Sequence, residues 1–268
     1  MQEIQQSTTV GFAMGCDIAM NYPLWVAAKR LSVGMTAFPS TFRAIYRGGG
    51  SLFLSLGPTT IIEDLVTRSL QQSTIPLPDI VSAAASGVVA AVLVTSQVEH
   101  VITRAHSLDT SMGNTLSLLH KQRGISGLIV PPGMGMMICR EIPFAATLFH
   151  VRPALTQFVQ EQDVANGIDV QTIPWYLWIG REFGLGCITS IVASPISHVP
   201  SVIAAYQQGH GVSFRTAVNE LLNAGEGYKE LWRGLGARTV SLAGTFTVVP
   251  IVMSLLLPKE NKIDSGIE

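Results

Sequence analysis

Charged residues inside apolar stretches are the part of this sequence best placed to do chemistry. Arg140 and Glu141 stand side by side in one such stretch, and Asp17 and Glu63 interrupt two others. An ionised side chain is costly in apolar surroundings, so these residues by default indicate a binding site. The alternative is structural: Arg140 and Glu141 pair with the acids at positions 17, 63 or 64, and Asp17 is a hydrogen-bonded acid facing a helix bundle.

Other kinds of chemistry have little support in the sequence. The three glycines at 48–50 are not followed by the Gly-Lys-Ser/Thr of a phosphate-binding loop, and neither G-x-S-x-G nor H-E-x-x-H occurs. The three cysteines are odd in number and widely spaced, which argues against disulfides and zinc sites. His100 and His106 are six residues apart and would not share a helix face. We therefore expect no enzyme, no metal site and no cofactor.

The composition indicates a membrane protein. Hydrophobic residues make up 47% of the 268 residues and charged residues only 13%, and the mean hydropathy is +0.38. A soluble domain carries roughly a quarter of its residues as charged ones. The net charge of −1 excludes a chain-wide basic surface, so nucleic acid is not an expected partner. The expected partner is the lipid bilayer.

Apolar stretches long enough to cross a bilayer come in pairs. About 20 apolar residues are needed. Three stretches lack Asp, Glu, Lys and Arg: 80–98, 183–208 and 239–258. Three more are compromised by charges: 8–28 contains Asp17, 127–151 contains Arg140 and Glu141, and 48–62 runs directly into Glu63 and Asp64. Short polar segments separate the two members of each pair: 39–47, 111–123 and 213–222. The pattern predicts an all-α membrane protein with six transmembrane helices.

The pairs form three related units within a single domain of residues 1–268, at about 8–72, 79–158 and 175–258. AIYRGGG at 44–50 and ELWRGLG at 230–236 are variants of one phrase, an aromatic residue followed by Arg-Gly. GLIVPPGMG at 127–135 occupies the corresponding place in the middle unit. The sequence therefore predicts a threefold repeat of two long helices with a short helix between them.

These units resemble the mitochondrial carrier family over nearly the whole chain. The resemblance rests on the Gly turns that end at 48, 133 and 234, on REIPFAATLF at 140–149, on YPLWVAAKRL at 22–31 and on the GxxxG of residues 11–15. It implies short helices on the matrix side and a multi-pass location in the mitochondrial inner membrane, with cardiolipin-type lipids among the partners. Residues 1–9 lack a basic leader, so we expect the targeting signal to be internal.

The sequence departs from the family at its gates. Carriers end each odd-numbered helix with Pro-x-acid-x-x-base, and alignment leaves one acid and no base. Even-numbered carrier helices end with an aromatic residue, an acid and a base, and none of those pairs survives at 68 and 71, 153 and 156, or 253 and 256. The remnants of the matrix gate are Pro23, Glu99, Pro195 and Ser197.

The resemblance also implies where a solute would bind. Carriers contact their solute through the even-numbered helices, roughly midway along them. An arginine followed by an acid on the fourth helix resembles the pattern of amino-acid carriers, and Arg238 could replace the arginine that is missing at position 241. The implied contacts are Glu63, Arg140, Glu141, Arg238 and Ser241.

Loss of the gate pairs favours a structural function. Alternating access needs two states of similar free energy, and replacing both members of a buried ion pair by apolar residues favours one packed state. We therefore expect a degenerate carrier that serves as an accessory structural subunit of an inner-membrane complex, of the respiratory type, surrounded by other subunits. The alternative is an active carrier of amino or carboxylic acids, with hydrogen bonds from Glu99, Ser197 and Thr156 at its gates. A membrane receptor or insertase derived from the same fold is a third class.

Overall fold

The computed structural model describes residues 2–32, 34–39, 41–46, 48–73, 77–168 and 173–256, and all regular structure in these ranges is helical. The single long helices are α1 (Gln2–Ser32), α3 (Gly49–Gln71), α9 (Trp175–His210) and α11 (Leu235–Leu256). Two further rods each contain a π-helical turn: α4 (Asp79–Ala90), η1 (Ala91–Thr95) and α5 (Ser96–Ser107), and then α7 (Met134–Ala146), η2 (Thr147–Val151) and α8 (Arg152–Ala165). The short elements are α2 (Phe42–Ile45), α6 (Met112–Ile129), α10 (Phe214–Asn223) and the 3-10 helix η3 (Gly227–Trp232).

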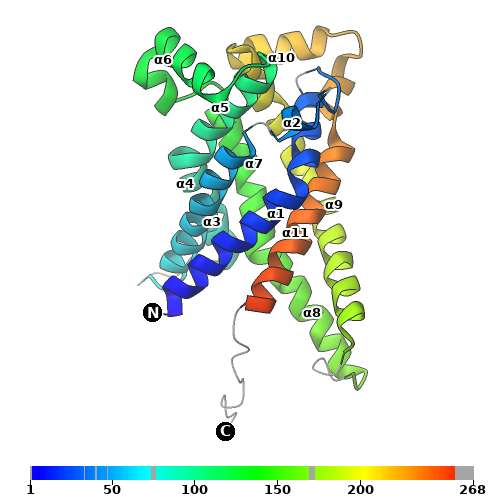
Figure 1. Cartoon of the computed structure of the whole chain (residues 1–268). Helices are drawn as coiled ribbons and strands as arrows, with labels where there is room; N and C mark the ends of the chain where they lie inside the picture. The colour runs from blue at the N-terminus through cyan, green and yellow to red at the C-terminus, as the bar shows by residue number, and fades with distance from the viewer. Residues whose placement is uncertain are drawn as a thin grey trace.

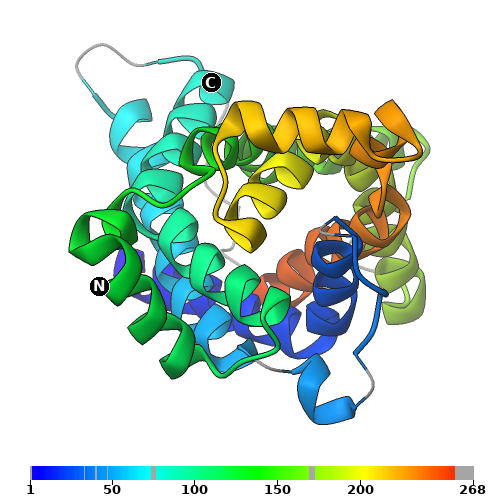
Figure 2. The ribbon, with the colours of Figure 1, turned by 90° about the horizontal axis from the view of Figure 1, so that it is seen from above.

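The long helices form a closed ring. Contacts run from α1 to α3, from α3 to α4, from α4 to α7, from α7 to α9, from α9 to α11 and from α11 back to α1. Figure 2 shows this ring from above, and Figure 1 shows its helices inclined against one another. In addition, α1, α5 and α9 contact each other directly. Because α5 leads into α6, these three helices meet at the end of the ring where α6 lies.

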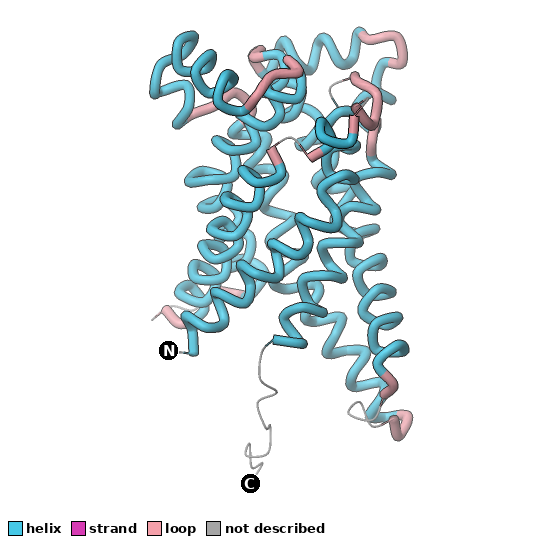
Figure 3. Tube along the Cα trace, in the orientation of Figure 1, coloured by secondary structure: helices cyan, strands magenta, loops and turns pink. Residues whose placement is uncertain are grey.

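The three short helices α2, α6 and α10 lie at one end of the molecule, here called the short-helix end (Figures 1 and 3). Each begins in the same way: the side-chain oxygen of Thr41, Ser111 or Ser213 accepts a hydrogen bond from the backbone N–H three residues later, at 3.3 Å. This cap satisfies one of the N–H groups that the first helical turn leaves without a partner. The beginning of α1 and the end of α11 lie at the opposite end.

Three glycines adopt the left-handed conformation just before long helices. Gly48 and Gly133 have φ +82° before α3 and α7, and Gly234 has φ +85° before α11. A residue with a Cβ is strained at such angles. The Tyr-Arg-Gly, Pro-Pro-Gly and Trp-Arg-Gly sequences are therefore turns whose last residue must be glycine for steric reasons.

Three helical segments are long and apolar enough to span a membrane: Asp79–Ser107, Trp175–His210 and Gly227–Leu256. They contain the stretches predicted from the absence of charge, except residues 257 and 258, which lie outside the described residues. The protein is therefore all-helical with at least these membrane-spanning candidates, as the composition predicts. The interrupted stretches are also helical, in α1, α3 and the rod of α7 and α8.

One predicted boundary was wrong. Residues 127–129 belong to α6 rather than to the following long helix, which begins at Met134. The apolar run GLIV hides the break, because hydrophobicity continues across it while the backbone turns at Gly133. Gly124 has non-helical angles (φ 65°, ψ −167°) and bends α6 in its second half.

Candidate functional site

The centre of the ring holds a small cavity of about 80 Å³. Its walls come from α1, α3, α5, α7 and α11, and its polar residues are Asp17, Asn21, Glu99, Arg140, Glu141, Arg238, Ser241 and Thr245. Pockets for small molecules usually exceed about 300 Å³. The cavity is therefore smaller than such a pocket in the described conformation.

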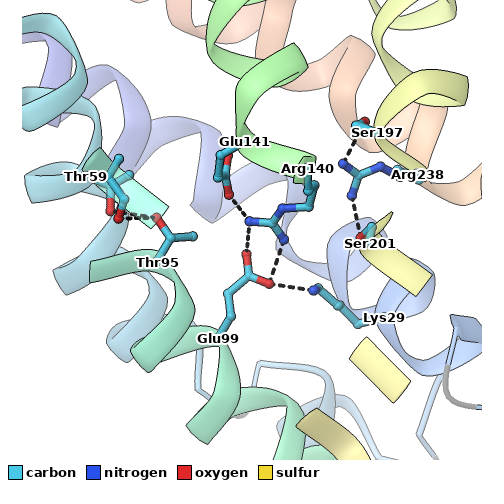
Figure 4. Close-up of polar contacts among 10 residues, drawn as sticks. Lys29, Thr59, Thr95, Glu99, Arg140, Glu141, Ser197, Ser201 and Arg238 are labelled. Carbon is cyan, nitrogen blue, oxygen red and sulfur yellow. Dashed lines mark hydrogen bonds and ion pairs between the residues drawn. The ribbon is translucent and has the colours of Figure 1, made fainter. Parts of the chain in front are cut away.

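A buried ionic cluster forms one wall of this cavity, and Glu99 is its centre (Figure 4). Lys29 Nζ lies 2.5 Å from Glu99 Oε2. Arg140 contacts both carboxylate oxygens, with Nη1 donating to Oε2 at 2.7 Å and Nη2 lying 2.6 Å from Oε1. All three side chains are at most 7% exposed. The cluster joins α1, α5 and α7.

Arg140 has a second acidic partner, because its Nη2 also pairs with Glu141 Oε1 (Figure 4). Glu63 on α3 is buried and feels the charges of both Glu141 and Arg140. Three of the predicted contact residues, Glu63, Arg140 and Glu141, are thus brought together. The guanidinium at the centre of this group is held bidentately, which fixes its orientation.

Arg238 is held differently from Arg140. Its Nη1 donates to Ser201 Oγ and its Nη2 to Ser197 Oγ, both at 3.0 Å (Figure 4). Within the described part of the chain it forms no ion pair with a carboxylate. Arg238 and Ser241 both line the cavity, so the structure brings all five predicted contact residues into one region. It also brings in Ser197, which the sequence analysis assigned to the gate.

The structure corrects two expectations about charge pairing. The carrier alignment predicts no base for Glu99, because position 28 is alanine; Lys29, one residue further, supplies that base. The structural alternative for Arg140 pairs it with the acids at 17, 63 or 64, whereas its contact outside its own helix is with Glu99. The carrier motif places its base five residues after the proline, and here that proline is Pro23, inside α1. Position 28 has no base, and the lysine that contacts Glu99 is one residue later.

The other acids singled out from the sequence, Asp64 and Asp17, have partners of their own. Asp64 accepts two hydrogen bonds from Arg68, one turn later on α3, at 3.0 and 2.9 Å. Asp17 accepts one from Thr245 Oγ1 at 2.8 Å and one from Asn21. The bond to Thr245 joins α1 to α11, as the structural alternative for Asp17 expects. Asp17 also lines the central cavity, so its binding role stays a prediction.

The remaining gate residues lie within helices. Pro23 is inside α1 and Pro195 inside α9, and Ser197 Oγ donates to Ala193 O at 2.9 Å while accepting from Arg238. No three His, Cys, Asp or Glu side chains of the described ranges are grouped so as to hold a metal ion. The chemistry available here is recognition of charge.

Sequence reasoning missed a second set of ion pairs, between α8 and α9. Arg152 is buried, pairs with Glu182 and donates from Nε to the carbonyl of Phe246 at 3.2 Å, so it also reaches α11. Arg181 pairs with Asp163. The partners are 30 and 18 residues apart in the sequence, and no local motif links them.

Known proteins give no assignment of function for this chain, so any proposal is based on its sequence and geometry. A scan against protein-family models finds no match, and a search of curated proteins finds none either.

Proposed function

We propose that this chain is a six-span protein of the mitochondrial carrier type that serves as an accessory structural subunit of an inner-membrane complex. The three-unit organisation is supported by local structure that recurs in order along the chain. A long helix leads to a short helix capped by Thr41, Ser111 or Ser213, and a left-handed glycine follows before the next long helix. The closed ring of long helices is the arrangement that such a repeat would produce.

The interrupted stretches can span the bilayer because their charges lie inside the ring. Asp17, Glu63 and Arg140 are all less than a tenth exposed. Charged residues in transmembrane segments characteristically face the bundle interior and pair there. Large apolar side chains point outward instead, among them Phe12 on α1, Phe53 on α3 and Ile191 on α9. The interior of the ring is therefore polar, and its outer surface is apolar.

The observation that carries the structural proposal is the distribution of ion pairs between the two ends of the ring. Toward the short-helix end, the pair between Lys29 and Glu99 joins α1 to α5. At the opposite end, the described interhelical ion pairs all link α8 to α9, and none joins α3, α8 and α11 across the opening. A carrier needs interactions that close each end in turn. This chain has them at one end, and positions 153, 156, 253 and 256 carry no charged side chain that could form them at the other, which favours a single packed state.

Lipid is the second expected partner, and an outer groove supports it. A largely apolar groove of about 530 Å³ lies between α3, the rod of α4 and α5, and α6, with Val94, Val98 and Leu128 among its residues. Its size and lining suit lipid acyl chains at the membrane boundary. We assign it to acyl chains of cardiolipin-type lipids, as the resemblance implies.

The test of the structural proposal is a native gel of mildly solubilised membranes, followed by mass spectrometry of the band that contains this chain. Stoichiometric co-migration with respiratory or ATP-synthase subunits is the expected result and would name the host complex. Migration near 28.7 kDa plus detergent would contradict it.

Transport of an anionic solute is a second candidate, and Arg238 is the observation that favours it. Its guanidinium lines the cavity and has hydroxyl partners but no described carboxylate. A carboxylate entering from the opposite end would supply the missing charge. The test is uptake of radiolabelled amino and carboxylic acids by reconstituted vesicles. Uptake that disappears in both Arg238→Met and Arg140→Ala, and persists in the exposed-site control Lys229→Met, would replace the structural proposal.

A further inference from the structure

The antiparallel pair of α8 and α9 extends beyond the rest of the molecule. Figure 1 shows the end of α8 and the beginning of α9 projecting past the start of α1 and the end of α11. Helix α9 has 36 residues and α3 has 23, which correspond to about 54 and 34 Å at 1.5 Å per residue. The hydrocarbon core of a bilayer is about 30 Å thick. The beginning of α9 is therefore carried beyond the level at which the neighbouring helices end.

The end of this pair, here called the hairpin tip, has apolar side chains that no other part of the described chain covers. Val164 lies in the last turn of α8 and Ile168 just after that helix ends, and Trp175 and Leu177 lie in the first turn of α9. Their exposed fractions are 70%, 46%, 73% and 56%. Large exposed apolar groups gathered in one place mark an interaction site, and tryptophan is the residue most enriched at the centres of protein interfaces.

The hairpin tip is held as a rigid unit. The ion pair of Arg181 with Asp163 joins α9 to α8 close to the tip, and that of Arg152 with Glu182 joins them again nearer the ring. The buried Arg152 also reaches the carbonyl of Phe246 in α11. The aromatic side chain of Trp175 is therefore presented on a braced support, which lowers the entropy lost on binding.

Charge identifies the kind of partner. Residues 153–180 contain three acids, Glu161, Asp163 and Asp169, and no lysine or arginine. Asp163 is paired with Arg181, so the excess of acid in this part of the sequence comes from Glu161 and Asp169. An acidic tip is repelled by the anionic lipids that attract basic segments. A protein surface with an apolar pocket surrounded by basic residues would be complementary to it in both respects.

We propose that the hairpin tip docks into a basic, apolar-centred protein surface on a neighbouring subunit, with Trp175 as the apolar anchor and Glu161 as an acidic contact at its edge. This inference rests on the proposed structural function, because it names the surface by which the accessory subunit attaches. It concerns a part of the chain outside the ring, well away from the central ionic cluster.

The experiment compares variants in native gels of mildly solubilised membranes. Trp175→Ala and Glu161→Lys should each reduce the co-migrating fraction of this chain by about tenfold or more. The matched controls are Tyr228→Ala and Glu226→Lys on the short-helix side, where the tyrosine is 68% exposed and the glutamate side chain 66%; both should co-migrate as the unchanged protein does. All these residues are exposed, so folding is preserved, and thermal melting in detergent verifies this.

A second measurement separates protein from lipid as the occupant of the tip. A variant that keeps Trp175 as its only tryptophan is placed in vesicles of brominated phosphatidylcholine, which quenches tryptophan in the acyl region. Its fluorescence should be unquenched, while a reference variant with its sole tryptophan introduced by Ile188→Trp, at a 53% exposed site on α9, should be quenched. Quenching of Trp175 would place the tip in the bilayer and overturn the inference.

The outcomes also distinguish failure of this inference from failure of the proposed function. If the unchanged protein co-migrates with a complex and both tip variants do so equally well, the structural function stands and the tip is not its docking surface. If Trp175→Ala weakens attachment but Glu161→Lys does not, the partner surface is not basic and the inference fails. If the unchanged protein migrates alone, the proposed function fails first.

Discussion

Lys29 and Glu99, on different helices and 70 positions apart in the sequence, form a 2.5 Å ion pair that is almost fully buried. Arg140 shares the same carboxylate, so one acid neutralises parts of two cations. Such a group is stable only as a whole, because removal of one member leaves the others charged in apolar surroundings. The central cluster is therefore the point at which the ring is most sensitive to substitution.

Glu99→Gln should destabilise the folded protein by about 3–5 kcal/mol, because Lys29 and Arg140 lose their shared counter-ion. The measurement is thermal unfolding in detergent. The matched control is Glu226→Gln, whose 3.7 Å pair with Lys229 is exposed and should contribute less than about 1 kcal/mol. Equal effects in the two variants would contradict the assignment of Glu99 as the centre of a buried cluster.

Apolar replacement of the whole cluster should be much less harmful than the single change. A combined variant with Lys29→Met, Glu99→Leu, Arg140→Met and Glu141→Gln removes these three charges together with the buried acid that pairs with Arg140. Replacing a buried ionic group by apolar residues of similar size is often neutral or stabilising. We expect the combined variant to recover most of the stability lost in Glu99→Gln, measured in the same assay. A further loss would show that the ions do more than hold the helices together.

Gly87→Ala should disturb the contact between α4 and α7. A Cβ at Gly87 would lie 2.7 Å from the carbonyl oxygen of Glu141, which is backbone and cannot turn away. Overpacking of this kind costs about 1–3 kcal/mol. Gly184→Ala in α9 is the control, because its Cβ would meet nothing within 4 Å and helix propensity should make it neutral or slightly stabilising. The comparison is again by thermal unfolding.

Six spans would place alternating segments on opposite sides of the membrane. Single cysteines at Ser73 and Asn166 should react with an impermeant maleimide from one side, and those at Lys121 and Glu226 from the other, in a background without the native cysteines. These sites distinguish a protein with six spans from one in which only the three uncharged segments cross the membrane. If only the three uncharged segments crossed, no span would lie between positions 121 and 166, and both would react from the same side.

Arg152→Met should loosen α8 from α9 and leave the central cluster intact. Glu182 would remain buried without its cation, and the carbonyl of Phe246 would lose a donor. We expect a protease to cleave residues 153–180 faster in detergent. The control is Arg233→Met, which should change little because the Arg233 side chain is 41% exposed in its ion pair. Unchanged cleavage would show that the ring alone fixes this pair of helices.

The sequence predicted what depends on composition and local patterning. Absence of charge located the three clear spans, and the aromatic-Arg-Gly phrases located turns that need a left-handed glycine, as at Gly48 and Gly234. Contacts such as that of Lys29 with Glu99 could not be predicted from the sequence. They depend on the rotation of each helix about its own axis relative to the neighbouring helix. The spacing of the carrier motif from Pro23 predicted the base at position 28, whereas the side chain that contacts Glu99 is Lys29. Arg152 and Glu182 were missed for the same reason.

The π-helical turns η1 and η2 have a consequence for how this chain could tolerate changes in length. Each accommodates one residue more than an α-helical turn while leaving the faces on either side in place. Deleting a residue within η1 would convert the rod to a plain α-helix with Glu99 still directed at Lys29. The same deletion between η1 and Glu99 would rotate that acid by about 100°, away from its partners. These turns are therefore the places where a single-residue deletion can be absorbed without loss of the interior.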